Sequence, residues 1–232
     1  MYQFNSRIRF SETNEKKELS LTAIIDYFQD CSTFQTEDLG VGFTYLEPRG
    51  LTWVLSYWQI IIDEYPQLGE EITVGTLPYD FKSFLGRRNF FLEKEGRKVI
   101  MADSLWTLLD RKAMRPVKIP VELLNTYQKE EKLKMEYAPR KIAVSGEEYP
   151  EDTLEIQRHH LDCNGHVNNG QYIKITSSFL PTGFVVKQLR AEYKNQAYLG
   201  DVMYPYCYRE ENKFTVVLCN EQKQPYVIVE YC

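Results

Sequence analysis

Hydrophobic and polar positions near the start of the chain follow a helical period. The hydrophobic side chains after Ser20 recur every three or four residues, which is typical of one face of an α-helix. They are Leu21, Ile24, Ile25, Phe28 and Cys31. Serine is favoured at helix N-caps and glycine just beyond helix ends. The pattern therefore predicts a helix that begins after Ser20 and ends near Gly40.

Aromatic and β-branched residues dominate the rest of the first half. Such residues favour strands, and Gly and Pro mark the turns between them. Strands are predicted for 51–66, 71–81, 87–96 and 97–110, with a tight turn around Gly96. A shorter charged segment, 6–14, is predicted as a strand before the helix. This half is therefore a strand, a helix and about four strands.

The second half repeats this order. A strand is predicted over 152–162 and a helix from Asn168 or Asn169 to Pro181. The later segments, 184–210, 213–222 and 224–232, all have strand-forming compositions. One local match indicates a duplication: YPQLGEEITV, residues 65–74, aligns with QAYLGDVMYP, residues 196–205.

A duplicated unit of one helix and one curved antiparallel sheet predicts an α+β fold. The helix would bury its hydrophobic face in the concave side of the sheet. Residues 127–141, YQKEEKLKMEYAPRK, are charged and lack hydrophobic periodicity, so they are predicted to connect the halves. The predicted domains are residues 1–126 and residues 142–232.

Composition narrows the function classes. The chain has 232 residues, 43% hydrophobic and 26% charged, which is typical of a globular protein with a substantial core. Its five cysteines form no CxxC pair, which favours free thiols in the cytoplasm and predicts neither a metal site nor a cofactor. The net charge of −5 argues against nucleic-acid binding. No apolar run approaches the length of a membrane span, and the N-terminus does not resemble a signal peptide.

All three histidines lie within RHHLDCNGHVNNGQYIK, residues 158–174. Asp162, Asn164 and His166 are spaced two apart, so an extended loop would project them to one side. A carboxylate, an amide and an imidazole would then meet just before the predicted helix. Such a set can hold a water molecule and move a proton near neutral pH. A D-x-N-x-H run before a helix is also common as a plain turn and cap.

LDCNGHVNNGQYI resembles the D-x-N-x-H-V-N-N signature of acyl-acyl-carrier-protein thioesterases of plants and bacteria. LTWVLSYWQIIIDEYPQLGEEITVGT, RRNFFLEKEG and DSLWTLLDRKAMRPVKIPVEL resemble the family's first domain in order and spacing. The resemblance implies a tandem double hotdog fold. It also implies hydrolysis of long- or medium-chain fatty acyl-acyl carrier protein, which releases free fatty acid and terminates chain elongation.

Our hypothesis is direct attack by a water molecule that Asp162, Asn164 and His166 position. The helix start at Asn168 and Asn169 would stabilise the oxyanion. Plant members carry a Glu-Cys pair where this chain has Gln196 and Ala197, so a cysteine nucleophile is unsupported. We expect Gln196 to orient water through its amide and Asp162 to be the base. Cys163 is expected to be a packed thiol.

The first domain is implied to hold the acyl chain, with Trp53 and Trp58 as candidate contacts. An acidic carrier protein needs local basic groups on this acidic chain to steer the encounter. The candidates are Arg87, Arg88, Arg111, Lys112, Arg115 and Lys118.

Three other functions of this fold are open at the level of sequence. An acyl-CoA thioesterase would use the same catalytic set, since one fold hosts several chemistries. A hotdog dehydratase is disfavoured because no His-Phe-Pro segment is present. A non-catalytic acyl-binding protein is supported only by Gln196. A tandem already contains the pairing of two hotdogs, so either a monomer or a homodimer is expected.

Overall fold

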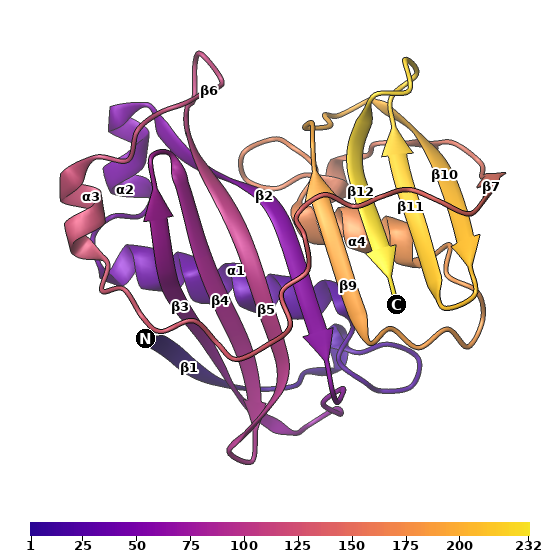
Figure 1. The fold of residues 1–232 in the computed structure, drawn as a ribbon, viewed down its shortest axis with the longest axis horizontal. Coiled ribbons are helices and arrows are strands. Elements are labelled where there is room, and N and C mark those ends of the chain that lie inside the picture. Colours follow the sequence, from indigo (N-terminus) through magenta and orange to yellow (C-terminus); the bar gives the residue numbers. More distant parts are fainter. The chain divides into compact units, whose positions relative to one another are not determined.

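The computed structural model describes residues 1–232 and contains two compact units. Unit 1 comprises Met1–Ser56 and Ile62–Tyr137, and unit 2 comprises Tyr57–Ile61 and Ala138–Cys232. Each unit has an antiparallel sheet and one main helix, α1 (Leu21–Asp38) or α4 (Asn169–Ser177) (Figure 1). The predicted order of one helix and one sheet in each half is therefore confirmed.

The sheet of unit 1 has the strand order β1-β3-β4-β5-β2. Its strands are β1 (Tyr2–Arg7), β2 (Leu51–Ile62), β3 (Glu71–Lys82), β4 (Leu85–Lys94), β5 (Arg97–Asp110) and the short β6 (Arg115–Pro116), which pairs with β5. The short helices are η1 (Phe10–Glu12), α2 (Phe43–Leu46), η2 (Glu47–Arg49) and α3 (Val121–Thr126). The predicted strand at 6–14 is wrong beyond Arg7, because the chain turns there through η1.

Helix α1 forms as its sequence pattern predicts. The Ser20 hydroxyl accepts a hydrogen bond from the Ala23 N–H at 3.2 Å, which satisfies one of the unpaired amides at the helix start. The helical face with Ile24 and Phe28 is fully buried. Phe28 packs on Phe90 of β4, with 5.2 Å between ring centroids. The hydrophobic stripe therefore holds the helix against its own sheet.

The sheet of unit 2 has the order β9-β12-β11-β10-β7, and the Tyr57–Ile61 segment of β2 pairs with β9. The strands are β7 (Glu147–Pro150), β8 (Leu154–Glu155), β9 (Gln188–Tyr193), β10 (Val202–Glu210), β11 (Lys213–Cys219) and β12 (Pro225–Tyr231). Helix α4 is tied to β12 by a hydrogen bond of 2.6 Å between the hydroxyls of Thr176 and Tyr231.

Three predictions for unit 2 were wrong in extent. The strand expected over 152–162 is limited to β8, because Arg158–His160 forms a 3-10 turn, η3. Helix α4 ends at Ser177, before Pro181. The strand-forming stretch 184–210 is two strands, β9 and β10, separated by a loop.

The duplication extends to the turns. Gly69 and Gly200 have φ of +87° and +82°, values that favour glycine, and each lies two residues before its strand, β3 or β10. In unit 1 the Glu70 carboxylate accepts from the Gln67 N–H at 2.8 Å. In unit 2 the Asp201 carboxylate accepts from the Tyr198 N–H at 2.9 Å. The two halves thus form the same carboxylate-closed turn.

The connector predicted at 127–141 has no helix or strand. Its Leu133 N–H and Tyr137 hydroxyl both bond to the Asn89 side-chain oxygen on β4, at 3.0 Å each. The neighbouring Arg88 reaches Gln35 of α1, and successive strand residues point to opposite faces. The connector therefore covers the face of the unit 1 sheet that lies away from α1.

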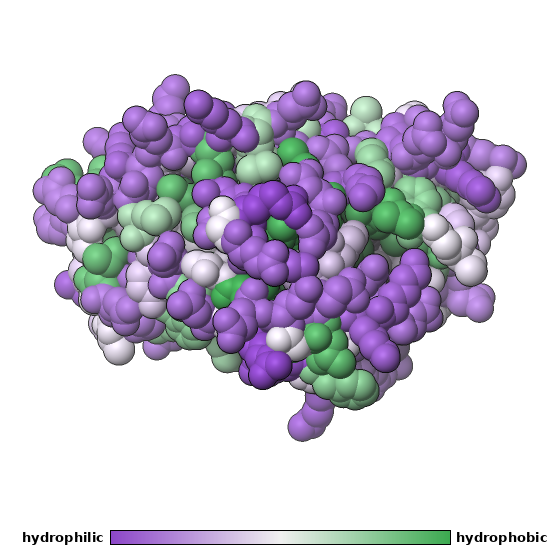
Figure 2. Space-filling model, turned by 90° about the horizontal axis from the view of Figure 1, so that it is seen from below, coloured by the Kyte–Doolittle hydropathy of each residue, from purple (hydrophilic) through white to green (hydrophobic).

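The face in Figure 2 is mainly hydrophilic, with hydrophobic residues in small groups. None of the helices has the length and apolar character needed to cross a membrane.

We expect Phe28→Ala to lower the free energy of unfolding by about 3–5 kcal/mol, because it opens a cavity in a packed core. Phe10→Ala is the matched control, since Phe10 is 82% exposed and Phe28 is 0% exposed. Urea titration of both variants measures the difference. Equal losses in the two variants would contradict the placement of α1.

Candidate functional site

The loop between η3 and α4 is a closed turn. The Asp162 N–H donates to the His166 carbonyl at 2.8 Å, and the Gly165 N–H donates to the Asp162 carbonyl at 3.1 Å. Gly165 has φ +78°, a value that suits glycine. Asp162, Asn164 and His166 are therefore brought together by a tight turn, whereas the sequence predicted an extended loop.

The Asp162 carboxylate closes this turn. Its Oδ1 accepts from the Asn164 N–H at 2.8 Å and from the His166 N–H at 3.4 Å. Its Oδ2 lies 3.5 Å from the Asn164 amide nitrogen. Two of these three contacts come from backbone amides, so backbone amides are what fix the carboxylate. Cys163 is exposed, and its expected packing is wrong.

Unit 1 contains the same turn without the same chemistry. Asn14 Oδ1 accepts from the Lys16 N–H at 2.9 Å and from the Glu18 N–H at 3.0 Å. Asn14, Lys16 and Glu18 thus occupy the places of Asp162, Asn164 and His166. The turn needs only a side-chain oxygen at its first position. The negative charge of Asp162 is therefore not required for the fold of the loop.

The N-terminus of α4 follows directly. Asn168 caps the helix, with Oδ1 accepting from the Gly170 N–H at 2.7 Å, so the helix begins where the sequence predicted. The Asn169 carbonyl accepts from the Tyr193 hydroxyl at 3.2 Å, which ties the first turn to β9. The helix dipole places partial positive charge beside the Asp162 turn.

His160 supports the turn from behind. Its Nδ1 accepts from the Gln157 N–H at 3.0 Å, and its carbonyl accepts from the Asn168 N–H at 3.0 Å. Burial, His159 and Lys174 lower the pKa of His160, which favours the neutral ring that can accept. Glu12 has the corresponding place in unit 1, where it accepts from the Arg9 N–H. His160 is thus a structural cap.

Gln196 lies in the loop after β9, and not in a strand as the strand-forming composition of 184–210 predicted. The Ala197 carbonyl accepts from the Val167 N–H at 3.0 Å, which fastens this loop to the Asp162 turn. The Ala197 N–H donates to the Tyr172 hydroxyl of α4, also at 3.0 Å. Gln196 is therefore next to a residue that is bonded directly to the candidate site.

Tyr198 is a site residue that the sequence reasoning missed. Its ring meets the His166 imidazole edge-on, with 5.1 Å between centroids. Its hydroxyl donates to Gln196 Oε1 at 3.3 Å. The sequence did contain a signal for Tyr198: it lies two residues after Gln196 and two before Gly200, in the turn that is repeated at Gly69.

Arg88 cannot serve in docking, because its side chain is buried and 7% exposed. Its guanidinium donates to Gln35 at 2.6 Å and lies over the Tyr127 ring. Burial lowers the pKa of Arg88. The prediction for Arg88 is wrong, since alternation of side chains along β4 turns it towards α1.

Arg87 forms an ion pair of 3.3 Å with the buried Asp103, which offsets the charge of Arg87.

The other basic candidates lie around β6, in the loop that extends beyond the sheet of unit 1 (Figure 1). Arg111, Lys112, Arg115 and Lys118 are all exposed. Arg111 pairs with Glu47 at 3.1 Å. The other three form no ion pair. We call this segment, residues 111–118, the basic loop.

Of the two tryptophans predicted to contact substrate, Trp53 is partly buried and Trp58 is fully buried. Trp53 packs in unit 1 against a hydrophobic cluster. The cluster consists of Val41, Leu46, Leu51, Leu108, Ile119, Leu123 and Tyr127. Trp58 is fully buried and lies opposite Ala191 of β9 in unit 2.

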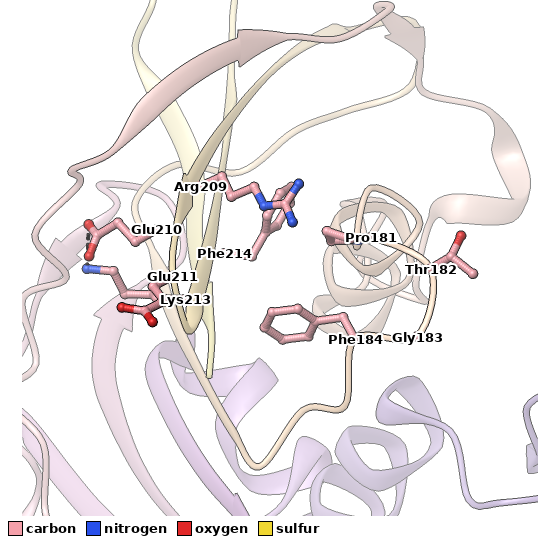
Figure 3. A pocket seen from close by; sticks show the side chains of 9 residues that line it. All are labelled: Pro181, Thr182, Gly183, Phe184, Arg209, Glu210, Glu211, Lys213 and Phe214. Atoms are coloured by element: carbon pink, nitrogen blue, oxygen red, sulfur yellow. Dashed lines mark ion pairs between the residues drawn. The ribbon is translucent and has the colours of Figure 1, made fainter.

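A cavity of ≈ 210 Å³ lies beyond the C-terminal end of α4 (Figure 3). Phe184 and Arg209 point into it, and Glu210 pairs with Lys213 at its rim, at 2.9 Å. Helix α4 has nine residues and is about 13 Å long, so this cavity is remote from the Asp162 turn. We assign it no part in the candidate site.

The solved structures of known proteins show the same fold. An acyl-ACP thioesterase from Bacteroides thetaiotaomicron matches with a TM-score of 0.90 and 23% identity, covering 99% of this chain and 96% of that one. The 12:0-ACP thioesterase from Umbellularia californica matches with a TM-score of 0.84 and 17% identity, covering 99% and 95%. The predicted tandem double hotdog is therefore confirmed.

Sequence comparison gives plant relatives. The chloroplastic dodecanoyl-[acyl-carrier-protein] hydrolase of Cinnamomum camphora is 25% identical over 218 residues, 84% of this chain and 56% of that protein. The chloroplastic palmitoyl-acyl carrier protein thioesterase of Arabidopsis thaliana is 23% identical over 218 residues, which cover 84% of this chain and 52% of that protein. The chain spans about half the length of these relatives.

Family models match most of the chain. Residues 1–127 match the acyl-ACP thioesterase N-terminal domain, and residues 143–223 match the C-terminal domain. These two matches, together with the shared fold, establish that the chain belongs to the acyl-ACP thioesterase family.

Proposed function

We propose that this chain hydrolyses the thioester of long- or medium-chain fatty acyl-acyl carrier protein, releases free fatty acid and so terminates chain elongation. The observation that carries the proposal is the Asp162 turn. It brings a carboxylate, an amide and an imidazole to the start of α4 in a member of this family. Residues 142–232 would supply the catalytic groups, and residues 1–126 would supply the acyl pocket and carrier docking.

The reaction begins with a water molecule held by Asp162, Asn164 and His166. Its oxygen adds to the thioester carbon, and its proton passes to Asp162, directly or through His166. Negative charge then develops on the carbonyl oxygen, where the positive end of the α4 dipole stabilises it. The C–S bond breaks next, and the leaving sulfur takes up the transferred proton.

Asp162 is the proposed base because Gln196 cannot accept a proton on its amide. Its Oδ1 is occupied by two backbone N–H groups, so Oδ2, the oxygen beside Asn164, would receive the proton. Asn164 would hold the water or the carbonyl through its amide. His166, at the end of the turn, would relay the proton to the leaving group.

The basic loop would dock the carrier protein. Its exposed cations stand out on a chain with net charge −5. Opposite charges raise the rate of encounter with an acidic partner. An acyl-CoA presents no protein surface to this loop, so an effect confined to the carrier-bound substrate would distinguish the two thioesterase functions.

We expect Asp162→Asn to reduce kcat by about 10²–10⁴-fold, because it removes the base and keeps the turn. Asn14 already closes the equivalent turn in unit 1 with an amide oxygen. Steady-state hydrolysis, followed by thiol release, measures the change. His166→Ala is expected to reduce kcat by at least about 10²-fold.

The matched control is Asn14→Asp, the reverse change in the other copy of the turn. It should leave kcat unaltered, although it changes the side-chain oxygen that accepts from two backbone N–H groups in this turn. Near-normal turnover of Asp162→Asn would show that another group is the base. Thermal unfolding of both variants establishes that they are folded.

We expect reversal of charge at Lys112 and Arg115 to raise KM for acyl-carrier protein by about three- to tenfold, since each change weakens electrostatic encounter. KM for acyl-CoA of the same chain length should stay constant. Lys223→Glu, at an exposed lysine between β11 and β12, is the control. Equal changes for both substrates would contradict docking at the basic loop.

A further inference from the structure

Tyr198 contacts two of the proposed catalytic side chains at once. Its ring lies edge-on to the His166 imidazole, at an interplanar angle of 71° and a centroid separation of 5.1 Å. Its hydroxyl donates to Gln196 Oε1 at 3.3 Å. The same side chain therefore limits the rotation of the imidazole and of the amide.

The backbone of Tyr198 is held firmly, although the residue is 49% exposed. Its N–H donates to Asp201 Oδ2 at 2.9 Å, and its carbonyl accepts from the Asp201 N–H at 3.1 Å. The Gly200 N–H donates to the Ile156 carbonyl at 3.0 Å. A side chain that extends from so tight a turn can position its neighbours.

The hydroxyl contact decides what Gln196 can offer. A glutamine amide has one acceptor oxygen and two N–H donors. The Tyr198 hydroxyl donates to Oε1, which engages one of the two lone pairs of that oxygen and orients the amide so that Nε2 lies on the side away from this hydroxyl. Gln196 then presents N–H groups, which bind a carbonyl oxygen or an oxyanion but cannot take a proton from water.

The equivalent turn of unit 1, at Gly69, has no counterpart of the Tyr198 side-chain contacts. Gln67 has the place of Tyr198 and Tyr65 has the place of Gln196, as the matching carboxylate-closed turns establish. The Gln67 amide donates to the Tyr65 carbonyl, a backbone group. The turn therefore forms without a tyrosine at this position, and the contacts of Tyr198 are additional to the fold.

We propose that Tyr198 is a positioning residue of the thioesterase site, which holds the His166 imidazole edge-on and fixes Gln196 as a hydrogen-bond donor to the reacting carbonyl oxygen. This proposal rests on the proposed function. It assigns oxyanion stabilisation to Gln196 and leaves proton transfer to Asp162 and His166.

The test is a double-mutant cycle with Tyr198→Phe and Gln196→Ala. Each single change is expected to lower kcat about three- to tenfold with little change in KM, because a donor aimed at the oxyanion acts mainly in the transition state. The double variant should be no slower than Gln196→Ala. Tyr198→Ala should be slower than Tyr198→Phe, because it also removes the ring beside His166.

The matched control is Tyr226→Phe. The Tyr226 hydroxyl donates to Asp201 Oδ2 at 3.3 Å, so this variant loses one hydroxyl from the same turn and nothing from the site. Its kcat should equal that of the unaltered protein. Additive effects in the cycle, an unaltered Tyr198→Phe, or an equal loss in Tyr226→Phe would each overturn the proposal.

NMR separates this proposal from the proposed function. Tyr198→Ala should shift the ring-proton resonances of His166, and Tyr198→Phe should shift the side-chain amide resonances of Gln196. Tyr226→Phe should shift neither. These shifts are measurable even if the protein has no thioesterase activity. Unchanged resonances in both Tyr198 variants would overturn the positioning role.

Discussion

The turn that the Asp162 carboxylate closes is the constraint on which the site depends. Its Oδ1 holds two backbone N–H groups, and this contact sets where Asn164 and His166 leave the chain. The same turn delivers the chain to Asn168, which caps α4. One side chain thus fixes both the catalytic candidates and the start of the helix whose dipole faces them.

The internal duplication separates structure from chemistry at this turn. Unit 1 keeps the turn, the cap and the following helix, with Asn14 and Ser20 in the places of Asp162 and Asn168. It replaces the amide and imidazole by Lys16 and Glu18. The hydrogen-bond pattern is therefore a property of the fold, and the set of a carboxylate, an amide and an imidazole is particular to unit 2.

Charged residues of unit 1 lie both in its interior and in the exposed basic loop. Arg88 and Asp103 lie inside unit 1, where hydrogen bonds to neighbours offset the cost of burial. The basic loop keeps its cations in water, where they act over distance. Sequence alone does not show whether a basic residue is buried or exposed. Arg87 and Arg88 are adjacent in the sequence, but alternation along β4 sends their side chains to opposite faces of the sheet.

The sequence by itself determined the two main helices, most strands and the turn glycines. Hydrophobic periodicity, caps and glycines act over a few residues, and α1 and α4 begin where Ser20 and Asn168 predict. Tertiary structure alone decided that Arg88 is buried, that Gln196 lies in a loop and that Tyr198 meets His166. These depend on contacts between residues distant in the chain, about which local pattern carries no information.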